Sequence, residues 1–431
     1  MRPAPLTGPG PGGGLGRPAL PPSAPRSRRH PMYRRLPAAF GAVLALSAVL
    51  APAAHAADTP RTLVVATTGS DAAPGTLTQP LRTVQAAIDL ARPGDTITVR
   101  GGRYPLTDNL TVAHSGEAAR PITLGAYPGE RVVIDGEQLP AGHTPLGGSI
   151  ARADRGALHI EAAYWRISDL ELVNGPYGVY CRDCTGNVFA RLSTHDNYES
   201  GFQLEGASGN NQILDLDSYR NRDPRKNGES ADGLAIKEGG GTGNLVRGAR
   251  LWDNVDDGLD AWKFTSPITV ENTVSYGNGY NRWNFPDFAG DGNGFKLGGG
   301  TPAPAAGHIL RNVLAFDNAA KGLTDNGNPG AITVSRSTSY ANKATGFDFD
   351  TAAAKAGLTD NLSVADPTAY AGSATTTATG NSWNLSGSWG ASAMQSTATA
   401  AITAARRADG SLPAAPSLLV PRSGTAIGAR F

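Results

Sequence analysis

Four aspartates and one lysine in this sequence have the types and spacing needed for acid–base chemistry beside a cation. Asp256, Asp257 and Asp260 lie within five residues, Asp232 lies upstream of them, and Lys296 lies downstream. An aspartate before a glycine is ordinary turn chemistry. Four carboxylates without a matching cluster of arginine or histidine, however, repel one another unless they are protonated or share a cation. Oxygen-only ligands favour Ca²⁺ over a transition metal, so the aspartates are predicted to hold calcium.

Lys296 is predicted to be a general base. It follows the glycine-rich frame Gly290-Asp291-Gly292-Asn293-Gly294 and lies near the expected cation. A nearby positive charge lowers the pKa of an amine, and a neutral amine can accept a proton. In a uronic acid polymer, such a base could remove the C5 proton while the 4-linked oxygen departs, which predicts an unsaturated product and an alkaline optimum.

An acidic polymer also needs cationic partners, for which Lys237, Arg282 and Lys321 are candidates. Three other functions are compatible with the residues. A carboxylate pair could hydrolyse a glycan without calcium, an epimerase could share the base, or a solenoid could bind glycans or calcium without catalysis. Hydrolysis and simple binding both predict that function survives the loss of Lys296.

An internal repeat defines the scaffold that must position these residues. A glycine precedes an apolar residue at intervals of 32, 25, 36, 28 and 24 residues, and an asparagine recurs upstream of most of these glycines. The glycines are Gly201, Gly233, Gly258, Gly294, Gly322 and Gly346, and the asparagines are Asn197, Asn254, Asn278, Asn318 and Asn342. A minimum near 24 residues accommodates three short strands and three turns, which predicts an all-β, right-handed parallel β-helix.

Aligning the coils on their glycines converts the repeat into predicted contacts. Residues in one column of successive coils lie about 4.8 Å apart, so Asp232 should stack on Asp257, and Asp260 should lie beside Lys296. On a straight strand, Asp257 cannot point outward while Leu259 points inward, which predicts a bend or bulge at Gly258. The recurring asparagines should hydrogen-bond along the axis.

Both ends of the predicted solenoid need covers. Apolar residues between Leu81 and Ala91 have helical spacing, which indicates an amphipathic helix over the N-terminal end. We expect the β-helix with its N-terminal cap over residues 58–350, and C-terminal coils with a cap of the same domain over 351–431. The alanine-rich stretch from Ala398 to Ala408 predicts a helix in this last segment.

The N-terminal residues 1–57 resemble an upstream extension followed by an export signal. An apolar run from Leu36 to Ala51 precedes the small-residue site Ala54-His55-Ala56, so we expect a secreted, extracellular protein rather than a membrane-anchored one. Removal of residues 1–57 leaves 31 basic and 37 acidic residues. The remaining sequence shows no basic face of the kind that a nucleic-acid partner needs. In an exported chain, Cys181 and Cys184 favour a local disulfide, with free thiols as the alternative. A monomer is expected.

Several motifs resemble those of the family-9 polysaccharide lyases, a group of pectate lyases. They are Ala231-Asp232-Gly233, the run from Trp252 to Asp260, Tyr276-Gly277-Asn278-Gly279-Tyr280, and the run from Gly290 to Gly299. The resemblance implies a secreted β-helix enzyme that cleaves pectate or polygalacturonate by β-elimination. It also implies Ca²⁺ held by the four aspartates and Lys296 as the Brønsted base; all five positions are present.

Overall fold

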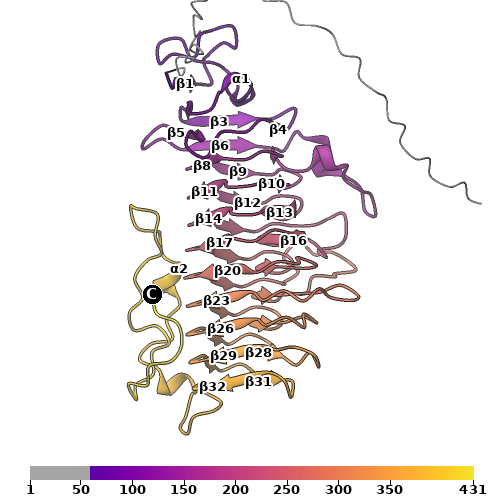
Figure 1. The fold of residues 1–431 in the computed structure, drawn as a ribbon, viewed down its shortest axis with the longest axis vertical. Coiled ribbons are helices and arrows are strands. Elements are labelled where there is room, and N and C mark those ends of the chain that lie inside the picture. Colours follow the sequence, from indigo (N-terminus) through magenta and orange to yellow (C-terminus); the bar gives the residue numbers. More distant parts are fainter. Residues whose placement is uncertain (1–58) are drawn as a thin grey trace, which may run out of the picture. The chain divides into compact units, whose positions relative to one another are not determined.

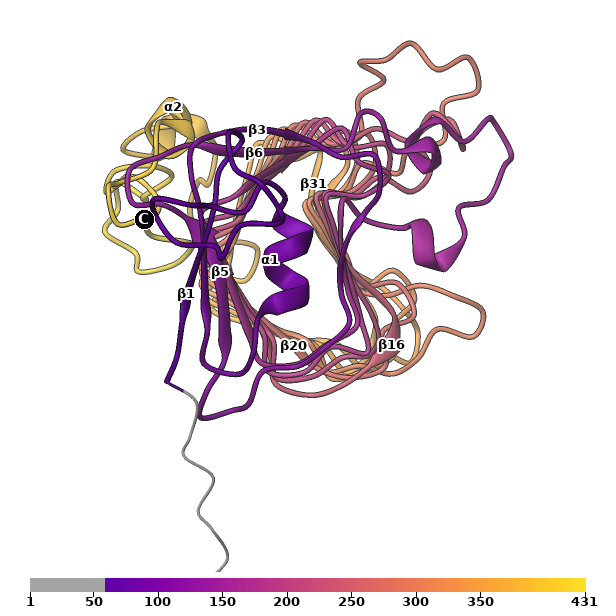
Figure 2. The same cartoon turned by 90° about the horizontal axis from the view of Figure 1, so that it is seen from above.

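Residues 59–431 are described by the computed structural model, and the predicted export segment lies outside this part. The described residues form three parallel sheets of 12, 10 and 10 strands, here called sheets A, B and C. Each coil contributes one strand to each sheet, except at the two ends, where β1 and β32 extend sheet A alone, and Figure 1 shows the coils stacked along one axis. Viewed along that axis, the sheets enclose a continuous interior (Figure 2). The predicted right-handed parallel β-helix is confirmed.

The strands are short, as coils of this size require. Sheet A comprises β1 Thr62–Val65, β2 Thr96–Val99, β5 Ile122–Ala126, β8 Trp165–Ser168, β11 Val188–Ala190, β14 Gln212–Leu214, β17 Asn244–Arg247, β20 Ile268–Glu271, β23 Ile309–Arg311, β26 Thr333–Ser335, β29 Gly357–Thr359 and β32 Thr377–Thr379. Sheet B comprises β3 Gly102–Pro105, β6 Val132–Asp135, β9 Glu171–Val173, β12 Ser193–His195, β15 Asp217–Tyr219, β18 Arg250–Trp252, β21 Val274–Tyr276, β24 Leu314–Phe316, β27 Thr338–Tyr340 and β30 Leu362–Val364. Sheet C comprises β4 Leu110–Val112, β7 Leu158–Ile160, β10 Val179–Arg182, β13 Phe202–Ala207, β16 Leu234–Gly240, β19 Leu259–Asp260, β22 Phe295–Lys296, β25 Leu323–Thr324, β28 Thr345–Phe349 and β31 Thr368–Gly372.

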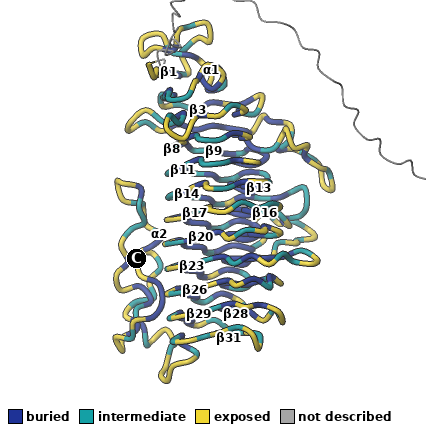
Figure 3. Tube along the Cα trace, in the orientation of Figure 1, coloured by how far each residue is buried: buried dark blue, intermediate teal, exposed yellow. Residues whose placement is uncertain are grey.

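The apolar residues that follow the repeating glycines form one inward column of sheet C. Leu234 pairs with Leu259, Leu259 with Phe295, and Phe295 with Leu323. All four side chains are buried in the core, and Figure 3 shows buried segments recurring along the stacked strands. The register predicted from the glycine alignment is therefore confirmed.

Of the expected bend or bulge at Gly258, the chain forms the bend, and the strand starts directly after it. β19 begins at Leu259, so Asp257 lies in the preceding turn and need not alternate with Leu259. The β16–β19 pairing runs through Leu259 and Asp260 without a register shift. Leu259 can therefore point inward while Asp257 points outward, because the turn ends at Gly258 and, of the two residues, only Leu259 belongs to the strand.

The asparagine ladder forms inside the turns between sheets B and C. Each asparagine side chain donates to the side-chain oxygen of the next, through Asn197, Asn221, Asn254, Asn278, Asn318 and Asn342. The predicted set therefore holds, and Asn221 joins it. Buried amides in such a chain satisfy one another, which holds successive turns in register directly beside the turns that carry the aspartates.

The glycines of sheet C are required by space. A Cβ on Gly322 would lie 2.3 Å from the Ser339 Oγ and 2.6 Å from the Gly346 carbonyl oxygen, whereas a Cβ on Gly390 would meet no atom within 4 Å. Gly322→Ala is expected to lower the free energy of unfolding by about 1–3 kcal/mol through overpacking. Gly390→Ala should change it by less than about 0.5 kcal/mol. Denaturant unfolding of both variants measures this difference, and equal effects would contradict the packing explanation.

Helix α1, Val84–Leu90, covers the N-terminal end of the coils, as predicted (Figure 2). Its N-cap Thr83 accepts a hydrogen bond from the Ala86 N–H, and its buried residues Val84, Ala87 and Ile88 face the core. No helix in residues 59–431 has both the length and the hydropathy needed to cross a membrane.

The C-terminal segment packs along the side of the coils. After β32, residues 383–431 run beside the solenoid (Figure 1, yellow), where Ile402, Leu418 and Ile427 form a second apolar cluster with Leu314 and Leu362 of sheet B. The helix predicted from Ala398 to Ala408 is wrong in extent, because α2 spans only Ala400–Thr403. It has no side-chain cap and buries one residue, so alanine propensity alone does not prolong it. The 3₁₀ helices are Pro140–His143, Arg152–Asp154 and Ala391–Ala393.

Candidate functional site

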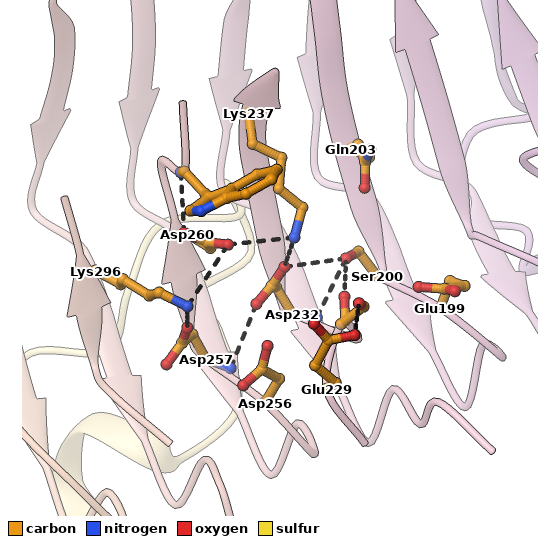
Figure 4. A network of polar contacts seen from close by, with 12 residues as sticks. Glu199, Ser200, Gln203, Glu229, Asp232, Lys237, Asp256, Asp257, Asp260 and Lys296 are labelled. Atoms are coloured by element: carbon orange, nitrogen blue, oxygen red, sulfur yellow. Dashed lines mark hydrogen bonds and ion pairs between the residues drawn. The ribbon is translucent and has the colours of Figure 1, made fainter. Parts of the chain in front are cut away.

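Three consecutive coils of sheet C bring the predicted aspartates and the lysine together. Asp232 precedes β16, Asp256 and Asp257 precede β19, and β19 and β22 end at Asp260 and Lys296. Asp260 is the register partner of Lys296. Figure 4 shows these side chains converging on the outer face of the sheet.

The aspartates form two overlapping groups rather than one group of four. Carboxylate oxygens of Asp232, Asp257 and Asp260 lie within 4.8 Å of one another, as do those of Asp256, Asp257 and Asp291. The four predicted ligands are all buried, whereas Asp291 is exposed. Asp257 belongs to both groups, so it is the centre of the acidic cluster.

Asp257 carries a carboxylate oxygen that suits a cation. Its Oδ1 accepts from the Asn293 N–H and Nδ2 at 2.7 and 2.9 Å. Its fully buried Oδ2 has no hydrogen-bond donor in the described structure and is only ion-paired with the Lys296 Nζ, at 3.0 Å. Backbone and amide donors thus orient this carboxylate while one oxygen is left for a ligand. The all-oxygen donor set fits Ca²⁺.

Two lysines offset part of the negative charge of the cluster. The Lys237 Nζ lies 2.7 Å from Asp232 and 3.2 Å from Asp260. The Lys296 Nζ lies 2.6 Å from Asp291, 3.0 Å from Asp257 and 4.0 Å from Asp260. With side chains 13% and 10% exposed, both lysines face carboxylates rather than solvent.

Burial and mutual repulsion make the acids hard to ionise. Burial raises the pKa of Asp232 to about 6, against the opposing effect of Lys237, and raises that of Asp257 to about 7, against Lys296. Burial and then the Asp257 charge raise the pKa of Asp256. Asp257 therefore takes up a proton near neutrality and Asp232 takes one up in slightly more acidic solution, unless a cation replaces those protons.

The pKa of Lys296 shifts opposite to the direction predicted from the sequence. Burial lowers this pKa, but the carboxylates of Asp257, Asp260, Asp256 and Asp291 together raise it above the ordinary value. The prediction assumed that the cation dominates, whereas the carboxylates alone dominate here. A lowered pKa therefore requires their charge to be neutralised.

A groove of about 680 Å³ opens beside the cluster. Lys237, Asp260, Asp291 and Lys296 line it, together with Arg155, Tyr177, Glu199, Gln203, Arg225 and Trp262 among others. Of the three predicted substrate-binding residues, only Lys237 is part of this lining. A groove beside a cation site and an amine could hold an extended acidic polymer.

Arg282 and Lys321 do not line the groove. Arg282 binds Asp253 at 2.7 Å, and Lys321 pairs with Asp348. Asp253 and Asp348 therefore keep the side chains of Arg282 and Lys321 away from the groove. Position in the repeat does not reveal these ion pairs.

Sequence reasoning missed Asp291 and Asn293. Asn293 shares the column of Asp232 and Asp257, a signal that could have identified it. Asp291 precedes Lys296 by five residues, as Asp232 precedes Lys237. Away from the site, the structure joins Cys181 and Cys184 in a disulfide.

Comparison with known proteins places this geometry in a family. A family model described as "Pel9A-like, right handed beta helix region" matches residues 63–361. Pectate lyase PEL9 of Emericella nidulans is 48% identical, over 89% of this chain and 96% of its own. Pectate lyase L of Dickeya chrysanthemi is 33% identical, over 82% of each chain. The crystal structure of pectate lyase Pel9A has a TM-score of 0.73 at 30% identity, covering 85% of this chain and 90% of that one. The chain therefore belongs to the Pel9A-like family of right-handed β-helix polysaccharide lyases.

Proposed function

We propose that this protein is a secreted, calcium-dependent lyase that cleaves pectate by β-elimination. One observation carries the proposal. The Nζ of Lys296, the candidate general base, lies 3.0 Å from Asp257, the central carboxylate of a cluster that could hold a cation, and this cluster borders a groove. The relatives named as pectate lyases support the substrate class. The disulfide supports export.

Asp232, Asp256, Asp257 and Asp260 would hold calcium, with the exposed Asp291 at the rim of the cluster. A calcium ion held there would supply positive charge to neutralise the substrate carboxylate and to stabilise the negative charge that develops next to C5. The Asn293 side chain and backbone N–H keep Asp257 in place. Asp256 and Asp257 follow Asn254 in a turn that the asparagine ladder holds in register, so this part of the site is formed before substrate binds.

Lys296 then acts on the sugar in the groove. Its neutral amine takes the C5 proton, the C4–O bond breaks, and a C4=C5 double bond forms as the glycosidic oxygen leaves with the bonding electrons and takes a proton from solvent. Asp257 and Asp291 position the Nζ at the wall of the groove.

The test is incubation with polygalacturonate, followed by the ultraviolet absorbance of the unsaturated product. Absorbance should rise with calcium and stop when a chelator is added. No absorbance change with calcium, across alkaline pH, would overturn the proposal. Release of reducing ends without new absorbance would instead indicate hydrolysis.

Calcium affinity is expected to increase with pH. Asp257 and Asp232, whose pKa values are about 7 and 6, are largely protonated at pH 5 and largely ionised at pH 8. A cation must displace these protons at the lower pH only, so the Kd should be at least about 10-fold weaker there. Calorimetry at both pH values measures this, with buffers of different ionisation enthalpy to count the released protons. A Kd independent of pH would contradict it.

A further inference from the structure

Lys237, on β16, lines the groove and also contacts the acidic cluster that could hold a cation. Figure 4 shows Lys237 and Lys296 approaching Asp260 from different strands. Unlike Lys296, Lys237 forms no ion pair with an exposed carboxylate: in residues 59–431 its ammonium bonds only to the buried oxygens of Asp232 and Asp260.

Both partners of Lys237 belong to the set of oxygens that a cation would use. Asp232 and Asp260 contribute two of the three carboxylates that lie within 4.8 Å of one another. A divalent ion between them competes with the ammonium for the same oxygens. Once the ion takes these oxygens, an ammonium that is only 13% exposed lacks its counter-charges, which is costly unless another anion replaces them.

Apart from Lys296, which also pairs with Asp257 and Asp260, three other basic residues line the groove and do not face this exchange. Arg155 pairs with Glu205 at 3.2 Å, Arg225 pairs with Glu199, and Lys226 pairs with Glu229 at 3.1 Å. None of these three glutamates belongs to the acidic groups that could hold the ion. Ion binding therefore leaves these three pairs intact, whereas the ion competes with Lys237 for both of the carboxylates that this lysine contacts.

We infer that Lys237 is an internal counter-cation that calcium displaces from Asp232 and Asp260, and that it then binds the carboxylate of a uronate sugar in the groove. This inference rests on the proposed lyase function. Calcium lets Lys237 bind substrate, and a bound carboxylate keeps Lys237 from competing for the calcium ligands. Each ligand therefore strengthens the binding of the other. A methyl ester carries no charge and cannot replace the aspartates, so Lys237 favours unesterified polymer.

The test compares Lys237→Gln and Lys237→Met with wild type and with the control Lys343→Gln, because Lys343 pairs with Asp317 at 2.9 Å and does not line the groove. In free enzyme, loss of the competing ammonium should tighten calcium binding by about 10-fold, measured by calorimetry. At saturating calcium, loss of the carboxylate contact should raise KM for polygalacturonate by about 10-fold or more. The change in KM should be small for methyl-esterified pectin. The control should change neither value.

Loss of Lys237 should strengthen calcium binding and weaken substrate binding. A purely structural role of Lys237 would not produce these opposite effects. Weaker calcium binding by both variants, or an unchanged KM for polygalacturonate, would overturn the inference. Thermal unfolding with saturating calcium checks that the variants fold, and Lys237→Gln keeps a hydrogen-bond donor if Lys237→Met does not fold. The proposed function fails separately, when wild type itself yields no unsaturated product; calorimetry still tests the competition for calcium in that case.

Discussion

Replacing Lys296 by alanine is expected to lower kcat on polygalacturonate by about 10²- to 10⁴-fold, the usual contribution of a general base. Lys296 is the proposed base because it combines a place in the groove with contacts to Asp257 and Asp291. The variant should still bind calcium, because the lysine competes with the ion and is not one of its ligands. Initial rates of unsaturated product, together with calorimetry, separate these two properties.

Lys296→Arg distinguishes a base from a positive charge. A guanidinium keeps the charge but does not lose its proton, so this variant should be about as inactive as alanine if Lys296 abstracts a proton. Lys321→Ala is the control, since Lys321 pairs with Asp348 and lies outside the groove lining. Near wild-type activity of Lys296→Arg would mean that the lysine acts by charge alone.

The sequence suffices to predict the coils and the core of the site, because both follow from one repeat. A glycine in each coil fixes the register of sheet C, and this register places Asp260 beside Lys296. Gly258 shows why the signal is strong: a Cβ there would lie 1.9 Å from the Ser275 Oγ. Sterics thus preserve the glycine spacing, and the glycine spacing reveals which residues stack.

The residues contributed by long loops are harder to predict, since no repeat determines their path. Asp291 reaches Lys296 from the loop before β22, and its N–H donates to the Asp256 Oδ1 at 2.6 Å. Arg225 enters the groove from another loop, before β16, where it is held by Glu199. Such positions depend on contacts between insertions, which a single sequence does not align.

The charge state of the site is equally hidden from the sequence. A cation near Lys296 would lower its pKa, and this is the direction expected from the sequence. The carboxylates around Lys296 raise that pKa when they act alone. The direction of the pKa shift depends on which charge acts more strongly on the amine, that of the carboxylates or that of the cation. The pairing of Lys237 with Asp232 follows from the same competition, because a buried acid without an ion needs another cation.

Asp257→Asn is expected to weaken calcium binding by at least about 100-fold, more than is typical for loss of a group that only supports a ligand. Asp257 belongs to both acidic groups, and its Oδ2 has no hydrogen-bond donor. Asparagine retains one oxygen to accept from Asn293 but removes the charge. Calorimetry measures the affinity. Thermal unfolding gives a second readout, because a ligand at 100 times its Kd stabilises the folded state by about 2.7 kcal/mol.

The matched control for Asp257 is Asp253→Asn, in the same coil. Asp253 pairs with Arg282 outside the groove, and its φ of 55° is one that asparagine also tolerates. This variant should keep the calcium affinity and the calcium-induced rise in Tm. If Asp257→Asn retained both, the ion would have to bind without the carboxylate shared by the two groups. The elimination would then require a different arrangement of charge around Lys296, because Asp257 is the buried acid nearest to its Nζ.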